Sequence, residues 1–251
     1  CRESTDLQFL DRCEIEKEIF QYKYSLEEIS IDRLSGNIYK EVLFFDFEWN
    51  GVYNDKRNDI EQISINIPMV IGSIKLAKRL NCNRYIGFGS QAEYGIVNDT
   101  ITESTLCNPT TLYGKSKLIS SQIAKEMCDY YSIGFTWFRI FSLYGPNDNH
   151  KWFVHYLIEE LKSNNQVNMT LGEQLWDYLY IDDAVDILSN FVLKNKNLGI
   201  VNYASGNSLK LRDFVLMAKE CLNSTSVINF GAVEYRSDQV MNMKPDISKL
   251  Q

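Results

Sequence analysis

Apolar runs and helix-patterned stretches alternate along the first 145 residues, and this alternation most constrains the fold. The residues 42–47, 84–89 and 135–143 form short apolar, β-branched and aromatic runs, which predict buried strands. Between them, apolar residues recur at helical spacing: Ile60, Ile63, Ile67, Val70, Ile71, Ile74 and Ala77, and then Leu112, Ser116, Ile119, Ile123 and Met127. Pro68 should kink or restart the first helix. Strands separated by helices need crossover connections, so we expect an open, doubly wound parallel sheet with helices on both faces.

The pattern loosens after Gly145-Pro146. Residues 152–161 and 183–193 have helical spacing, 179–181 predicts a short strand, and 206–220 and 227–246 give mixed signals. We therefore expect two units. Residues 1–145, with about 179–204, would form the larger α/β domain, and 146–178 with 205–251 a smaller C-terminal α/β lobe.

The histidine count excludes two common kinds of active site. The 251 residues include only 2 histidines, His150 and His155, five apart and with no nearby cysteine. A histidine-built metal site and a Ser-His-Asp triad are therefore not expected, and no metal is predicted. Any proton chemistry must use Tyr, Lys, Ser or carboxylate groups.

The net charge limits which partners the protein can bind, and the cysteines indicate the redox state of its compartment. The formal net charge is -7, so the chain has no basic surplus for nucleic acid or anionic lipid. No apolar run reaches the ~20 residues of a membrane span. The 6 cysteines are scattered without a CxxC pair, which is typical of free thiols in a reducing compartment. We expect a cytoplasmic protein that binds neither nucleic acid nor membrane.

Tyr113 and Lys117 are four residues apart and would share one face of a helix. A free phenol has a pKa near 10, and a neighbouring ammonium lowers that value by stabilising the phenolate. Such a pair can exchange a proton with an alcohol or carbonyl. The spacing also arises often by chance, so on its own it is more often an ordinary helix surface than a catalytic pair.

Ser90 ends a predicted strand and enters a glycine-rich turn. Ligands of open α/β sheets sit outside the carboxyl ends of the strands, which is where this hydroxyl would emerge. It can hydrogen-bond a substrate oxygen and share a proton with Tyr113. A turn-capping serine is the alternative interpretation.

Four segments follow one another along the chain: 89–95 (GSQAEYG), 109–117 (PTTLYGKSK), 139–146 (RIFSLYGP) and 176–183 (WDYLYIDD). In this order they resemble the extended short-chain dehydrogenase/reductase family, in its NAD(P)-dependent nucleotide-sugar epimerase/dehydratase branch. The resemblance covers nearly the whole chain. It implies a Rossmann-like fold with a nucleotide-sugar lobe, and a homodimer formed through the helix that carries Tyr113 and its neighbour.

The resemblance also implies roles for individual residues. Ser90, Tyr113 and Lys117 match the catalytic set, with Tyr113 as acid/base and Lys117 also holding the nicotinamide ribose. The other residues expected at the cofactor are Arg2, Phe47, Glu48, Asn66 and Phe141. The residues expected at the substrate are Ser90, Gln91, Ser142, Trp176 and Arg236, the last as a guanidinium fork for the diphosphate.

Departures from the family pattern narrow the chemistry. Dehydratases of the family carry an acidic residue within two positions of the Ser/Thr, where this chain has Gln91 and Ala92. Glu93 is one residue further on, and we expect it to point elsewhere. Dehydration is therefore disfavoured, which leaves 4-reduction of a 4-keto-6-deoxyhexose nucleotide or 4-epimerisation. Trp176 replaces the arginine that the epimerases use, and this favours a reductase.

The first βαβ unit that the resemblance implies, with its glycine-rich phosphate loop, has no counterpart in this sequence. Cys1–Ser4 resembles the segment after the family's second strand. Two readings follow: the chain is part of a full enzyme, or it is a truncated, non-catalytic sugar-nucleotide binder. The intact catalytic set favours the first. Glu48 would then face an anionic cofactor, so it must point away or weaken binding. Arg2 and a net reduction favour NADP(H), with NAD(H) as the alternative.

Overall fold

The computed structural model describes residues 41–52, 56–149, 152–194, 197–236 and 239–251. Arg2 lies outside these ranges, as do the expectations made for Cys1–Ser4. Within the described ranges no helix has the length and hydropathy needed to cross a membrane.

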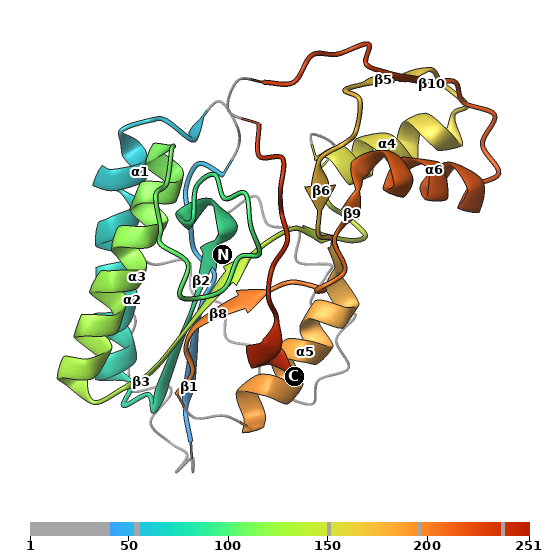
Figure 1. Cartoon of the computed structure of the whole chain (residues 1–251). Helices are drawn as coiled ribbons and strands as arrows, with labels where there is room; N and C mark the ends of the chain where they lie inside the picture. Colours follow the sequence, from blue (N-terminus) through green and yellow to red (C-terminus); the bar gives the residue numbers. More distant parts are fainter. Residues whose placement is uncertain (1–40, 53–55, 150–151, 195–196, 237–238) are drawn as a thin grey trace.

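A four-stranded parallel sheet forms the centre of the molecule (Figure 1). Its strands, in spatial order, are β1 (Leu43–Asp46), β2 (Arg84–Ser90), β3 (Gly134–Ile140) and β8 (Gly199–Tyr203). All seven residues of β2 are buried, because this strand has a neighbour on each side and helices over its face. The register pairs Ser90 with Ile140, and Ile140 with Tyr203, so the carboxyl ends of three strands meet at one edge. The predicted Rossmann-like parallel sheet is confirmed.

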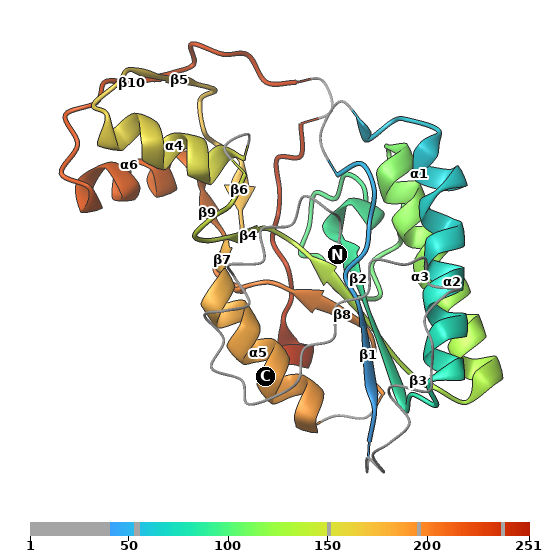
Figure 2. The same cartoon turned by 180° about the vertical axis from the view of Figure 1, so that it is seen from behind.

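Helices cover both faces of the sheet (Figures 1 and 2). One face carries α2 (Asn66–Arg79) and α3 (Leu112–Tyr131), and the other carries α5 (Ile181–Lys194). The core under α2 and α3 is built on Ile74, Tyr85 and Trp137. The core on the opposite face includes Ile86, Phe138 and Val201. Alternate residues of each strand thus enter opposite cores, as the pleat requires.

The helical stretch that contains Pro68 is broken into two helices, as the proline led us to expect. A short α1 (Glu61–Ser64) is followed by α2, and Ile65 links them. Pro68 occupies the first turn of α2, where a missing N–H costs nothing.

The predicted inner face of α3 is only partly right. Ile119 is 38% exposed, whereas the buried positions are mainly small residues: Gly114, Ser116, Ser120, Ser121, Ala124 and Cys128, together with Lys117. Small side chains let the helix approach its neighbours closely. The apolar spacing in the sequence favoured the face that carries Ile119 and Ile123, and it did not reveal that small residues form most of the buried face.

The predicted strand at 135–143 is also two elements. β3 ends at Ile140, and β4 (Leu143–Tyr144) pairs instead with β7 (Leu179–Tyr180), directly before α5. The chain then builds a second group of elements beside the sheet edge (Figure 1). These are α4 (Phe153–Lys162), β5 (Val167–Met169), β6 (Leu175–Trp176), β9 (Leu209–Lys210), α6 (Leu211–Cys221) and β10 (Ile228–Phe230). Its core includes Leu157, Leu161 and Val215. A 3-10 turn, η5 (Ser248–Leu250), ends the chain beside β8, where Lys249 Nζ donates to Ile200 O.

Candidate active site

Ser90 and Tyr113 come together at the carboxyl end of β2. Ser90 is the last residue of the strand and the N-cap of the 3-10 turn η4 (Gln91–Glu93), where its Oγ accepts the Ala92 N–H at 3.2 Å. Thr111 caps α3 through a bond from Gly114 N. A Cβ on Gly114 would lie 2.4 Å from Ala92 O, so only glycine allows this approach. The close contact places Tyr113 beside the end of β2.

The environment of Tyr113 keeps its proton in place at neutral pH. Burial raises the pKa of the phenol, while the Ser90 hydroxyl and the Arg57 guanidinium partly oppose the rise. The Arg57 guanidinium carbon lies 4.7 Å from the centre of the Tyr113 ring. Tyr113 is therefore a neutral hydrogen-bond donor, the form required of a catalytic acid.

Lys117 lies one helical turn further along α3 and is 6% exposed. Its Nζ donates to Phe88 O at 2.6 Å. Burial lowers its pKa to about 7, against the opposing effect of the Glu93 and Asp46 carboxylates. Its charge therefore changes within the physiological range.

Trp49 covers the Lys117 ammonium, and sequence reasoning did not single it out. The centre of its ring lies 3.7 Å from Lys117 Nζ, a cation–π contact. Its Nε1 donates to Gln62 Oε1 at 3.0 Å, and Gln62 also receives Asn66 Nδ2 at 3.1 Å. No local sequence pattern marks this contact, because Trp49 and Lys117 lie far apart along the chain.

Asn66, expected near the cofactor, supports this same segment. It is 1% exposed; its Oδ1 accepts Asn50 N–H at 2.7 Å and its Nδ2 donates to Asn50 O at 3.0 Å. Asn66 thus fixes the main chain after Trp49. Phe47 is 69% exposed and stacks on Phe88, with ring centres 4.3 Å apart.

Glu48 turns part of its carboxyl group inward. Its Oε1 is buried and has no hydrogen-bond partner among the described residues. Burial raises its pKa to about 7, and the nearby Asp46 carboxylate adds to the rise. The group is therefore partly protonated at neutral pH, which reduces the negative charge that the sequence places near a cofactor.

The residues expected at the substrate fall into three places. Ser142 and Trp176 meet, because Trp176 Nε1 donates to Ser142 Oγ at 2.8 Å. Beside them lies Phe141, which was expected at the cofactor rather than the substrate; it is 6% exposed beside Tyr94, and its N–H donates to Tyr203 O at 3.1 Å. Gln91 opens the turn after Ser90 and is partly exposed. Arg236 is an exposed residue of the segment after β10, where its carbonyl accepts the N–H of Gln239.

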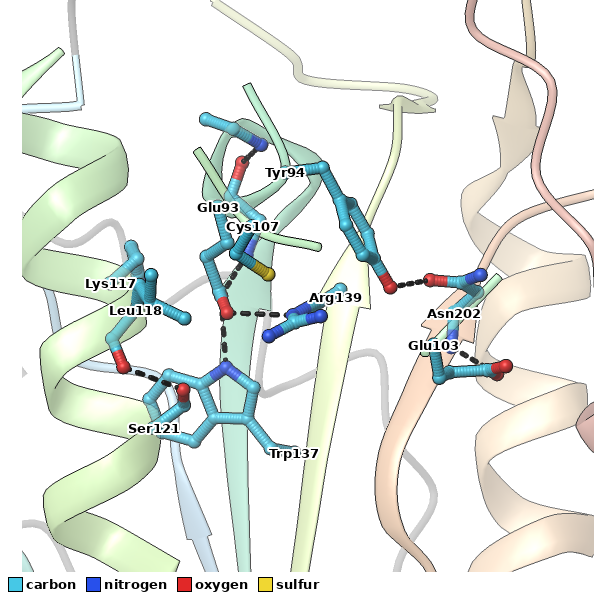
Figure 3. Close-up of polar contacts among 12 residues, drawn as sticks. Glu93, Tyr94, Glu103, Cys107, Lys117, Leu118, Ser121, Trp137, Arg139 and Asn202 are labelled. Carbon is cyan, nitrogen blue, oxygen red and sulfur yellow. Dashed lines mark hydrogen bonds and ion pairs between the residues drawn. The ribbon is translucent and has the colours of Figure 1, made fainter. Parts of the chain in front are cut away.

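Glu93 was set aside by sequence reasoning as pointing elsewhere, and it does turn into the core. It is 0% exposed, and its carboxylate receives three N–H groups: Ser90 N at 3.0 Å, Trp137 Nε1 at 3.0 Å and Arg139 Nε at 2.7 Å. Figure 3 shows Glu93 reaching down between Trp137 and Arg139, with Lys117 on the neighbouring helix.

A parallel sheet with helices on both faces defines a Rossmann-like α/β protein, and the Ser90, Tyr113 and Lys117 side chains lie at the carboxyl end of its strand β2. The chain belongs to the NAD dependent epimerase/dehydratase family, whose model matches residues 48–204.

The sequence identity to individual relatives is low. CDP-abequose synthase of Salmonella muenchen is 31% identical over 114 residues, which cover 45% of this chain and 39% of that protein. The enzyme of the same name from Yersinia pseudotuberculosis is 26% identical over 201 residues, or 76% and 66% of the two chains. The matched regions thus span less than two thirds of either relative. A solved UDP-N-acetylglucosamine 4-epimerase from Methanobrevibacter ruminantium has a TM-score of 0.78 at 18% identity, over 91% of this chain and 74% of that one.

Proposed function

We propose that this protein is an NAD(P)-dependent oxidoreductase that acts at C4 of a nucleotide-activated sugar, as a 4-reductase of a 4-keto-6-deoxyhexose nucleotide. One observation carries the proposal. The close approach of α3 at Gly114 to Ala92 lets the Tyr113 hydroxyl share a hydrogen bond with the Ser90 side chain at the carboxyl end of β2, with Lys117 one turn away. The similarity to CDP-abequose synthases supports the same class of substrate.

The side chains have complementary tasks in this reaction. Hydride from a bound reduced nicotinamide would reach C4. Tyr113 gives its phenolic proton to the C4 oxygen as the C=O bond becomes an alcohol. Ser90 donates a hydrogen bond to the same oxygen, and the charged form of Lys117 stabilises the phenolate that Tyr113 becomes. The raised pKa of Tyr113 suits an acid rather than a base.

The hydrogen-bonding groups of Lys117 and Glu48 are of the chemical types that the nicotinamide–ribose end of the cofactor would need. Lys117 supplies ammonium donors, and the orphaned Glu48 Oε1 is an acceptor that a ribose hydroxyl can satisfy. We expect NADP(H) over NAD(H), as inferred from the sequence. We also propose that residues 1–145 with about 179–204 serve the cofactor, and that 146–178 with 205–251 serve the nucleotide sugar.

Dehydration remains disfavoured in this proposal. Gln91 and Ala92 carry no acid, and the Glu93 carboxylate already receives three donors in the core. Glu93 is also fully buried, so its carboxylate is not open to a substrate.

A 4-epimerase is the second candidate, favoured by the similarity in fold to a solved 4-epimerase. A reductase consumes one NADPH per sugar, whereas an epimerase needs tightly bound NAD and shows no net turnover of cofactor. Full-length protein should therefore be mixed with NADPH and either CDP- or dTDP-4-keto-6-deoxyglucose. We expect stoichiometric loss of NADPH absorbance with one of them. No loss with either sugar nucleotide would rule out the reductase.

We also propose a homodimer that uses α3 and the helix layer next to it. Isoleucines on these helices are exposed, Ile63 to 36% and Ile119 to 38%. Sedimentation of the full-length protein tests this, and a monomer at micromolar concentration would contradict it.

A further inference from the structure

The buried carboxylate of Glu93 has an unusually complete set of partners for a residue outside the Ser90, Tyr113 and Lys117 set. Its three N–H donors come from the main chain of β2 and from two side chains of β3. The donor on β2 is the N–H of Ser90 itself. Glu93 therefore links the proposed catalytic serine to the neighbouring strand (Figure 3).

The glycines of β2 make room for this arrangement. A Cβ on Gly89 would lie 2.1 Å from both Glu93 Oε1 and Trp137 Nε1, and one on Gly87 would lie 2.3 Å from the Trp137 ring. No larger residue at either position is compatible with these contacts. The strand before Ser90 is thus shaped around the Glu93–Trp137 pair.

The charge of Glu93 is balanced by a buried arginine. The side chain of Arg139 is 5% exposed, and its guanidinium carbon lies 4.5 Å from the centre of the Tyr94 ring. Burial works against the charge of Arg139, but Glu93 and Tyr94 outweigh it and raise its pKa. A buried ion pair seldom adds stability over a well-packed apolar pair, so stability alone is a weak reason for this one.

We propose that Glu93 is a positioning residue of the active site: through its bonds to Ser90 N, Trp137 and Arg139 it fixes the orientation of the Ser90 hydroxyl toward Tyr113. The inference rests on the proposed oxidoreductase function of these side chains. The capping box strengthens it, because Glu93 holds the N–H of Ser90 while Ser90 Oγ accepts the Ala92 N–H.

The Glu93 charge has a second effect at the same site. It raises the pKa of both Lys117 and Tyr113, whose net shifts are set first by burial. Loss of the charge should therefore lower both pKa values. Because the proposed reaction uses the protonated forms of both groups, the alkaline limit of activity should move to lower pH.

Glu93→Gln in the full-length protein tests the positioning role. We expect kcat to fall about 10- to 100-fold, with the sugar KM changed less than about 2-fold and the alkaline limit of kcat moved to lower pH. Glu93→Asp keeps the negative charge but has a side chain one methylene shorter. The alkaline limit of kcat should therefore return to its wild-type pH, while kcat itself stays low. A folded Glu93→Gln protein with wild-type kcat and pH profile would overturn the inference.

Two further variants separate this role from folding. Trp137→Phe removes one donor to Glu93 without leaving a charge unpaired, and it should lower kcat about 3-fold at unchanged KM. If Glu93→Gln does not fold, wild-type kcat in Trp137→Phe overturns the inference instead. Glu41→Gln is the matched control, because Glu41 pairs with the buried Arg84 at 2.9 Å at the opposite end of β2. It should leave kcat and the pH profile unchanged.

A measurement without turnover keeps the two proposals separable. The ionisation of Tyr113 can be followed as the ultraviolet difference between each protein and its Tyr113→Phe counterpart. The Glu93→Gln protein should ionise at lower pH than the wild type, and equal values would contradict the inference. Inactivity of the wild type with every sugar nucleotide would contradict the proposed function alone.

Discussion

The Lys117 ammonium lies 3.7 Å from the centre of the Trp49 ring, buried between that ring and the main chain of β2. The contact removes water from a group that the proposed reaction uses in its charged form. The aromatic face returns only part of the lost hydration, so the pKa of Lys117 falls to about 7. Trp49, which lies outside the expected catalytic set, thus forms part of the burial that lowers the pKa of Lys117.

Trp49→Ala should raise the pKa of Lys117, because water regains access to the ammonium. The alkaline limit of kcat should then move to higher pH, opposite to the shift expected for Glu93→Gln. Trp49→Phe keeps an aromatic face but loses the bond to Gln62, so it should give a smaller shift. Trp152→Phe, in the second group of elements, is the control. An unchanged pH profile in Trp49→Ala would show that the ring does not govern Lys117.

Glu48 should make stability depend on pH in a defined direction. Its pKa is raised from 4.5 to about 7, first by burial. The folded state then binds this proton more tightly than the unfolded state, so stability falls as pH rises from about 4.5 through 7. Glu48→Gln removes that loss. It should add about 1–2 kcal/mol to the free energy of unfolding at pH 8, after a reduction for partial exposure, and little at pH 5.

Urea unfolding of the full-length protein at the two pH values measures this difference. Glu61→Gln changes an exposed carboxylate on α1 and should have no effect at either pH. An equal effect of Glu48→Gln at pH 5 and pH 8 would mean that the carboxyl does not titrate in this range.

Gly114→Ala should destabilise the protein, although alanine is normally the better helix former by about 1 kcal/mol. The added Cβ would meet Ala92 O at 2.4 Å, and the clash should cost about 1–3 kcal/mol. Because the shift moves Tyr113 away from Ser90, kcat should fall as well. Lys115→Ala, at an exposed position of the same turn, is the control. A stabilised, fully active Gly114→Ala protein would contradict the close approach of α3.

The Ser142–Trp176 bond should govern sugar binding rather than catalysis. Trp176→Phe and Ser142→Ala each remove the 2.8 Å hydrogen bond, and each should raise the sugar KM about 3- to 10-fold with kcat little changed. A double-mutant cycle should give a coupling of about 1 kcal/mol. Ser104→Ala, on the exposed loop before α3, is the control. Fully additive single changes would mean that the two residues act separately.

The sequence predicted the elements better than their contacts. Continuous apolar runs such as 84–89 identify buried strands, and Pro68 predicts the restart of a helix, because these signals are local. The inner face of α3 was only partly predicted, because Gly114 and Ser120 are small residues whose burial depends on a neighbouring element packing closely against them. The strand ending at Ile140 was overextended, since only the pairing of Leu143 with Leu179 reveals the break.

The site shows the same limit. Ser90, Tyr113 and Lys117 have fixed spacing and a recognisable chemistry, so a sequence pattern can find them. Glu93 and Trp137 are 44 residues apart, and no pattern along the chain joins them. Trp49 acts through Lys117, 68 positions away, and its role depends on where a ring lies in space.

Single turnover of the full-length protein with Tyr113→Phe beside the wild type tests the central claim most directly. With NADPH and the accepted 4-keto sugar nucleotide, wild-type protein should oxidise one NADPH per sugar reduced. Tyr113→Phe keeps the ring against Trp49 and Arg57 but has no proton to give. We expect it to bind the sugar nucleotide normally and to lose at least about 100-fold in rate. Equal rates for the two proteins would contradict the assignment of Tyr113 as the acid, and with it the proposed reaction.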